Sequence, residues 1–138
     1  EKNKEKKEWT PVKEAVPGVY PTTSPLSLCI RSGHLVFLSG IGGWYANRRA
    51  EPGDIKVQIE SALTDMKNQL EKAGTSMAKV LKVHMTHADP KQNLAPLNED
   101  YGKFFPDPKP ARSFSGAGID QMGRDGVLVQ IDCVAYID

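Results

Sequence analysis

One arginine has the sequence context of a group that binds anions. Arg112 comes shortly after three prolines, Pro106, Pro108 and Pro110, and it begins a stretch with the composition of a β-strand. Each proline fixes its own φ angle, so the chain before the arginine is stiff. Because side chains alternate along a strand, Arg112 shares a face with Phe114. A guanidinium held in this way can bind a carboxylate through two parallel hydrogen bonds, and a surface ion pair is the alternative.

The histidines do not form a recognisable site. His84 and His87 are three residues apart on a predicted strand, so they point to opposite faces and cannot share a metal ion. We therefore predict no metal site and no cofactor, and we interpret His34, His84 and His87 as hydrogen-bonded histidines of a sheet. The glycines at 40, 42 and 43 lack the Lys-Ser/Thr pair that follows in a phosphate loop.

The two cysteines indicate packing rather than catalysis. Cys29 and Cys133 are far apart and form no CxxC motif, so we predict two reduced thiols, which suits the cytoplasm. The chain does not begin with Met, and a removed targeting segment is the alternative to that location. Cys133 falls on the apolar face of the last predicted strand, where a buried side chain is expected.

Composition limits the classes of protein to which the chain can belong. Its 138 residues, 39% of them hydrophobic and 25% charged, suit one globular domain. We predict a charged N-terminal extension over residues 1–16 and a single domain over residues 17–138. A formal net charge of +1 argues against a dedicated nucleic-acid binder, and no apolar run approaches the roughly 20 residues of a membrane helix.

Hydrophobic periodicity predicts the elements that must position Arg112. Two short strands at 26–31 and 34–39 form a hairpin, after irregular extended chain at 9–25. A helix at 55–73 is capped by Asp54 and stopped by Gly74. The later elements are expected as a strand at 80–87, a helix at 92–105 with Pro96 in its first turn, a strand at 111–116 and a strand at 127–137. The order is β-β-α-β-α-β-β, an α+β mixed sheet with two helices on one face.

The last strand alternates regularly between two faces. One face carries only apolar or small residues, and the other is mixed: Leu128, Gln130, Asp132, Val134 and Tyr136. The first face belongs to the core. The mixed face is typical of a surface that contacts a ligand or another subunit.

Four segments together resemble the Rid family, also called YjgF-like proteins, which are reactive-intermediate deaminases of enamines and imines. They are GHLVFLSG at 33–40, QIESAL through LEKAG at 58–74, NEDYGKFF at 98–105, and PARS at 110–113 with VQIDCVA at 129–135. The resemblance spans most of residues 26–137. It implies a chorismate-mutase-like (YjgF-type) fold and a homotrimer with clefts between its subunits. It also implies hydrolysis of small 2-enamino or 2-imino acids to 2-oxo acids and ammonia.

The resemblance also assigns roles to residues. It implies that Arg112 holds the carboxylate of a small substrate, and that Asn98, Ser39 and Gly40 lie at the same pocket. Two pocket positions differ from the family pattern. Leu26 stands where the family has a tyrosine, although Tyr20 lies nearby in the sequence, and Phe114 stands where the family has a cysteine.

The most consequential difference is Gln130, which stands where the family has the glutamate that handles the attacking water. A glutamine can orient water through its carbonyl oxygen but cannot accept a proton. Asp132 lies on the same face about 7 Å along the strand and could substitute only in a displaced pocket. We therefore expect Arg112 and Gln130 to be the catalytic pair, with Leu26 and Phe114 making the pocket more apolar.

Three functions follow from these residues. The first is a Rid-type deaminase. The second is a non-catalytic or regulatory protein that binds a small carboxylate or an aromatic ligand in the same cleft. The third is a ribonuclease or translation inhibitor, which the near-neutral charge argues against.

Overall fold

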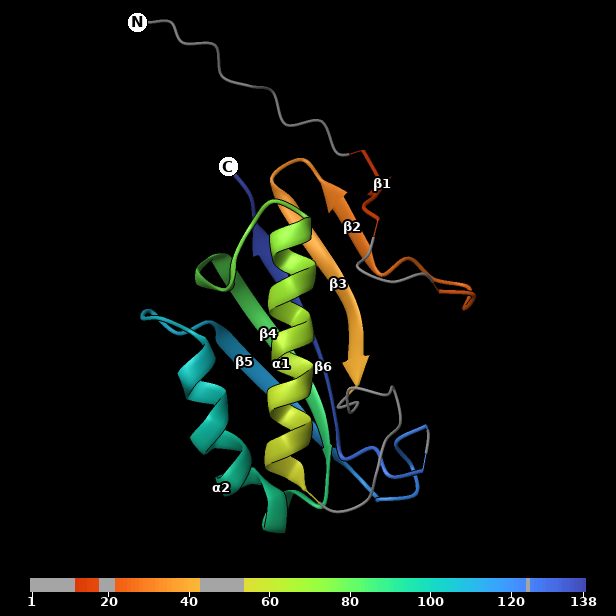
Figure 1. Ribbon diagram of the computed structural model, residues 1–138, viewed down its shortest axis with the longest axis vertical. Helices are drawn as coiled ribbons and strands as arrows, with labels where there is room; N and C mark the ends of the chain where they lie inside the picture. Colours follow the sequence, from red (N-terminus) through yellow and green to blue (C-terminus); the bar gives the residue numbers. More distant parts are fainter. Residues whose placement is uncertain (1–11, 18–21, 43–53, 124) are drawn as a thin grey trace, which may run out of the picture.

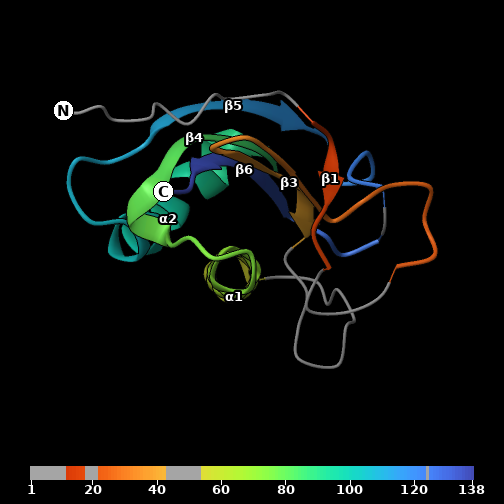
Figure 2. The ribbon, with the colours of Figure 1, turned by 90° about the horizontal axis from the view of Figure 1, so that it is seen from above.

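The computed structural model describes residues 12–17, 22–42, 54–123 and 125–138. In these ranges six strands form one sheet, and two α-helices lie against one of its faces (Figure 1, Figure 2). The predicted α+β class and the order of its elements are confirmed, with one short strand added at the N-terminal end. The charged stretch 1–8, Tyr20 and residues 43–53 lie outside the described residues.

The predicted hairpin is present. Strand β2 (Cys29–Ser32) and strand β3 (Leu35–Gly42) pair in antiparallel fashion, and Gly33 between them has a φ of 60°. Strand β1 (Glu14–Ala15) pairs with β2. The sequence predicted irregular chain at β1, and the structure corrects this because residues 12–16 contain no proline that would prevent pairing at the sheet edge.

Helix α1 (Ile55–Lys72) begins at the predicted residue and ends one residue before the predicted end. The Asp54 carboxylate accepts hydrogen bonds from the backbone N–H groups of Lys56 and Val57, at 2.9 and 3.4 Å. Gly74 stops the helix with a φ of 94°, a left-handed conformation that side chains with a Cβ rarely adopt.

The buried stripe of α1 forms the centre of the core. Ile59, Leu63, Met66 and Leu70 are fully buried against the sheet, and each such side chain contributes about 1.5–3 kcal/mol of burial free energy. Gln58 lies within this stripe. Its side-chain amide donates to the carbonyl of Gly126 at 2.6 Å and accepts from the backbone N–H of Leu128 at 2.7 Å. This polar residue therefore fixes the turn before the last strand to α1.

A crossover connects two neighbouring parallel strands. A short 3-10 turn, η1 (Met77–Lys79), leads into strand β4 (Val80–Ala88). Helix α2 (Pro90–Tyr101) then continues into a second turn, η2 (Gly102–Phe104), before strand β5 (Ala111–Ala117), which pairs in parallel with β4. The prediction that Pro96 lies in the first turn of this helix is wrong. Pro90 takes that place, because a proline at the first helical position loses no hydrogen bond.

The last strand, β6 (Val129–Tyr136), lies near the middle of the sheet. The strand order is β1-β2-β3-β6-β4-β5, so β6 pairs with both β3 and β4 and β5 is an edge strand. The residues of β6 that face the helices are buried, and those that alternate with them are half-buried or exposed. The predicted alternation is confirmed. Cys133 is buried on the apolar face as predicted, and burial raises the pKa of its thiol to about 12.

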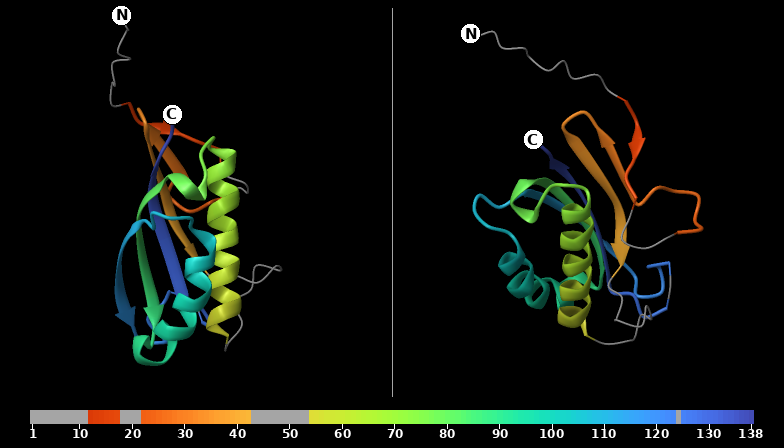
Figure 3. Two further views of the ribbon diagram at one scale, coloured as in Figure 1. Left: turned by 90° about the vertical axis from the view of Figure 1, so that its left-hand side faces the viewer. Right: turned by 45° about the horizontal axis from the view of Figure 1, so that its top comes forward.

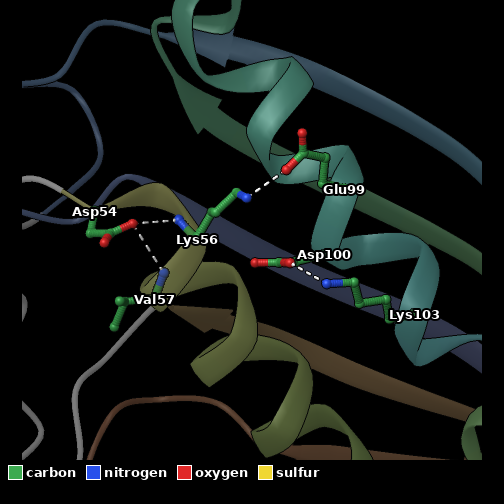
Figure 4. A network of polar contacts seen from close by, with 6 residues as sticks. All are labelled: Asp54, Lys56, Val57, Glu99, Asp100 and Lys103. Carbon is green, nitrogen blue, oxygen red and sulfur yellow. Dashed lines mark hydrogen bonds and ion pairs between the residues drawn. The ribbon is translucent and has the colours of Figure 1, made fainter.

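An ion pair links the two helices. Lys56 of α1 pairs with Glu99 of α2, and Asp100 of α2 accepts from Lys103 at 3.2 Å (Figure 4). The hydrogen bond to Glu99 is the main reason that the pKa of Lys56 is raised. In the side view of Figure 3, α1 and α2 lie together on one side of the sheet, and no helix of the described residues lies on its other face. We call the helix-covered side the inner face and the opposite side the outer face.

Candidate active site

Arg112 lies on the edge strand β5 and on the inner face, next to α2. Its Nη1 donates a hydrogen bond to the Asn98 side-chain carbonyl at 2.7 Å. Its guanidinium carbon lies 4.7 Å from the centre of the Tyr101 ring. Asn98 and Tyr101 are three residues apart, so they lie on one face of α2. The helix therefore supplies both contacts that orient the arginine.

Both groups that contact the guanidinium, the Asn98 amide and the Tyr101 ring, are uncharged. Among the described residues, no carboxylate forms an ion pair with Arg112, so the surface ion pair that the sequence left open is not found there. A guanidinium carries five N–H groups in a planar fork, and Asn98 takes up one of them. The remaining N–H groups and the full positive charge suit a bidentate contact with an anion.

Phe114 is the next side chain on the same face of β5, and 45% of it is exposed. The centre of its ring lies 5.0 Å from that of His87, which is in the adjacent strand β4. His87 is fully buried, and neither of its ring nitrogens has a hydrogen-bond partner. Burial, and secondly the charge of Arg112, lower the pKa of His87 below its usual 6.5. An uncharged imidazole thus lies behind the Phe114 ring.

The sequence interpretation of His87 as a hydrogen-bonded histidine is wrong. His84, by contrast, contacts the Ser113 hydroxyl at 3.2 Å on the outer face, and His34 contacts the Ile137 carbonyl at 2.9 Å. His84 and His87 lie on opposite faces of β4, as predicted. The burial of His87 could have been predicted from the sequence, because His87 alternates along the strand with Val83 and Met85, which are both buried.

Tyr101 is a second residue that sequence reasoning did not assign to the site. Its hydroxyl is buried without a hydrogen-bond partner, and burial raises its pKa to about 12 against a smaller lowering by Arg112. The ring is therefore a neutral surface below the guanidinium. Its spacing of three residues from Asn98 could have identified it.

A second group of predicted site residues lies elsewhere. Gln130 is an exposed residue of β6 on the outer face, opposite Gly42 of β3 and Thr86 of β4. Gly40 lies beneath it: a Cβ at Gly40 would be only 2.9 Å from Gln130 Nε2. The Ser39 hydroxyl donates to the Ser27 carbonyl at 2.6 Å, which joins β3 to the segment before β2.

Leu26 belongs to that segment before β2 and is 50% exposed. Asp132, like Gln130, alternates with the buried residues of β6 and lies opposite His84 of β4. Within one chain, therefore, the structure brings Arg112, Asn98 and Phe114 together on the inner face. It brings Gln130 and Gly40 together on the outer face, and the sheet separates the two groups.

The described residues offer neither a metal cluster nor a membrane helix. No three His, Cys, Asp or Glu side chains within the described ranges are grouped so that they could hold a metal ion. No helix in those ranges is long and apolar enough to cross a membrane. Cys29 and Cys133 are both free and buried.

Comparison with known proteins identifies the family. A family model described as Endoribonuclease L-PSP matches residues 19–137. The chain belongs to this family, the YjgF/Rid family. The predicted resemblance is thus confirmed across most of the chain.

Individual members of the YjgF/Rid family are similar to this chain over most of its length. The mitochondrial protein mmf2 of Schizosaccharomyces pombe is 32% identical over 111 residues, which are 80% of this chain and 86% of that protein. The chloroplastic Reactive Intermediate Deaminase A of Arabidopsis thaliana is 31% identical over 115 residues, 82% of this chain and 59% of that protein. The crystal structure of yeast Mmf1 matches with a TM-score of 0.75 and 26% identity, over 95% of this chain and 100% of the yeast chain.

Proposed function

We propose that this protein hydrolyses small 2-imino acids, and the 2-enamino acids from which they form, to 2-oxo acids and ammonia. The observation that supports this most directly is the state of Arg112. Its guanidinium is oriented by two neutral groups, and no carboxylate among the described residues pairs with it. It is therefore available to bind a substrate carboxylate. The chloroplastic relative named as a reactive intermediate deaminase supports the reaction class.

The proposed reaction takes up one water. The water oxygen bonds to C2 of the imino acid, the C=N electron pair moves to nitrogen, and the nitrogen takes a proton. The carbonyl then forms as ammonia leaves. Gln130 orients the water through its side-chain carbonyl and cannot itself take the proton, so the proton passes to the substrate nitrogen or to bulk water. Arg112 contributes by holding the substrate in position, an effect that can accelerate a step which also occurs spontaneously.

A second copy of the chain would complete this site. Arg112, Asn98 and Phe114 lie on the inner side of β5, whereas Gln130 and Gly40 lie on the outer face. The outer face also exposes 41% of Phe37 and 39% of Tyr136, which are large apolar residues that neither α1 nor α2 covers. We propose a homotrimer in which Gln130, Gly40, Ser39 and Leu26 of one subunit meet Arg112 of the next.

The test of the activity uses 2-aminoacrylate that a lyase generates in the cuvette. Wild-type protein is expected to form pyruvate faster than the reaction without protein. Arg112→Ala is expected to lower kcat/KM roughly 10- to 100-fold, because a hydrogen-bonded charge is lost. Lys67→Ala, which removes a cation from the exposed side of α1, is the control and should match wild type. If wild type and Arg112→Ala both equal the rate without protein, deamination of this substrate is wrong.

Gln130 supports a second candidate, a protein that binds small carboxylates without turning them over. The residue cannot act as a base, so binding can persist where catalysis does not. Calorimetric titration with pyruvate and 2-oxobutyrate separates the two. Binding that Arg112→Ala abolishes, together with no turnover of 2-aminoacrylate, would favour the binding protein.

The cytoplasmic location stays a prediction that rests on the two free thiols. The S. pombe relative is named as mitochondrial and the Arabidopsis relative as chloroplastic. Fractionation of cells that express the natural full-length protein would decide between these compartments.

A further inference from the structure

An exposed aromatic ring lies beside the proposed carboxylate-binding group. Arg112 and Phe114 are two residues apart on β5, so their side chains leave the strand on the same face about 7 Å apart. A 2-imino acid carries its carboxylate on one side of C2 and its side chain on the other. A substrate whose carboxylate contacts Arg112 can therefore extend its side chain along the strand toward Phe114.

The Phe114 ring is supported from behind. The His87 ring lies against it at 5.0 Å between centres, with 35° between the ring planes. His87 is itself fully buried in the core, and no hydrogen bond draws it away. One side of Phe114 is thus held while 45% of the residue remains exposed. A fixed aromatic surface close to a cation suits a ligand that combines an anionic group with a large apolar group.

We propose that Phe114, supported by His87, makes this protein selective for 2-imino and 2-oxo acids with an aromatic or large branched side chain over those with a methyl group. The inference rests on the proposed function of Arg112 and adds the class of side chain to it. A single extra methylene in an apolar site changes binding by about 1–3 kcal/mol, which is 10- to 200-fold. We therefore expect a preference of at least about tenfold for the larger substrate.

Two measurements test the selectivity. An L-amino-acid oxidase with excess catalase generates the imino acids of phenylalanine and alanine, and 2-oxo acid formation above the rate without protein gives kcat/KM for each. Calorimetric titration with phenylpyruvate and pyruvate measures the same preference without turnover. Phe114→Ala should lose the preference, and Phe114→Tyr should keep it. Val57→Ala, which shortens an apolar residue of α1 that is 41% exposed, is the control and should also keep it.

The outcomes separate this inference from the proposed function. Turnover of both imino acids with equal kcat/KM, or an equal loss for both in Phe114→Ala, would overturn the selectivity and leave deamination standing. A preference for phenylpyruvate in binding, lost in Phe114→Ala but without turnover, would uphold the selectivity and overturn deamination. If neither acid shows binding or turnover, both the selectivity and deamination are overturned. If Phe114→Ala changes the oligomeric state and not the preference, the ring contacts another copy of the chain and the inference is wrong.

Discussion

At the scale of single residues, the proposed site depends on an arginine that is held in position by neutral groups, so that its charge is available to an anion. Asn98 fixes the direction of Arg112 through its carbonyl oxygen, and the Tyr101 ring lies against the guanidinium. An aspartate at position 98 would orient the arginine equally well but would compete with the substrate carboxylate for the charge. The neutral amide thus combines orientation with availability.

Burial of His87 is expected to make the free energy of unfolding depend on pH. In the unfolded chain its pKa is near 6.5, and in the fold burial and the Arg112 charge lower it. Below pH 6.5 the unfolded chain therefore binds a proton that the folded chain resists, so the free energy of unfolding falls as the pH drops. Above that pH both states are neutral and the penalty vanishes. Urea unfolding should show a larger loss between pH 7.5 and pH 5.5 for wild type than for His87→Leu.

A control variant distinguishes His87 from the other titrating groups. His84→Gln removes the half-buried histidine on the outer face of the same strand. Its loss of stability over the same pH interval is compared with that of wild type, so that any contribution of a second histidine of β4 is measured separately. If His87→Leu also shows the same loss as wild type, burial of the neutral imidazole does not govern the acid side of the stability curve.

The sequence predicted the place of Arg112 better than its surroundings. The prolines before it and the alternation after it indicated a stiff entry and a face shared with Phe114. His87 and Tyr101 were missed because they are polar groups buried without partners, and periodicity treats such residues as core. Family resemblance supplied Asn98, and the hydrogen bond from Arg112 to Asn98 places the site beside α2.

At the scale of elements, prediction succeeded where one face is uniformly buried. Helix α1 and strand β6 each contact the core along a continuous apolar stripe, so the spacing of their apolar residues predicted both elements. The start of α2 was not predicted correctly, because both Pro90 and Pro96 could occupy a first turn; the structure has Pro90 there and Pro96 inside the helix. The two-residue strand β1 is too short to carry a pattern.

Two glycines on the sheet should respond differently to the same substitution. A Cβ at Gly116 of β5 would lie 2.5 Å from Cγ of Pro90, a rigid ring in the first turn of α2. Gly116→Ala should therefore displace α2 from β5 and lower the free energy of unfolding by about 1–3 kcal/mol. A Cβ at Gly40 would instead meet the end of the flexible Gln130 side chain, at 2.9 Å from Nε2.

Gly40→Ala serves as the matched variant. Because Gln130 can rotate away, we expect its stability to change by less than about 1 kcal/mol, while kcat falls because the proposed water-orienting amide has moved. Urea unfolding and the 2-aminoacrylate assay measure the two effects. Equal destabilisation by both alanines would contradict the assignment of rigid and flexible neighbours.

At the scale of the whole molecule, the sheet itself prevents one chain from forming the complete proposed site. Its two faces carry different parts of that site: the proposed anion-binding group beside α2, and the proposed water-orienting amide on the face opposite α1 and α2. In a ring of identical subunits, each interface joins one face of a subunit to a different face of the next. A proposed trimer would thus form three sites, each from two chains.

Mixed oligomers test this arrangement directly. Arg112→Ala and Gln130→Ala should each be strongly impaired alone. When the two variants are co-expressed with different tags and purified as mixed assemblies, a site is intact wherever the Arg112 of one subunit meets the Gln130 of the other variant. Every trimer that contains both variants has one such interface among its three, so we expect about a third of wild-type activity.

The recovery depends on the site being shared between chains. If Arg112 and Gln130 acted within one chain, every subunit in the mixture would lack one of them, and no activity would return at any ratio. Mixing two batches of the same variant is the control, since it changes protein concentration without creating an intact pair. Phe37→Glu adds a charge to the exposed outer face and should dissociate the assembly, which should abolish the recovered activity. Light scattering on each sample relates activity to assembly, and recovery in a protein that proves monomeric would contradict the shared site.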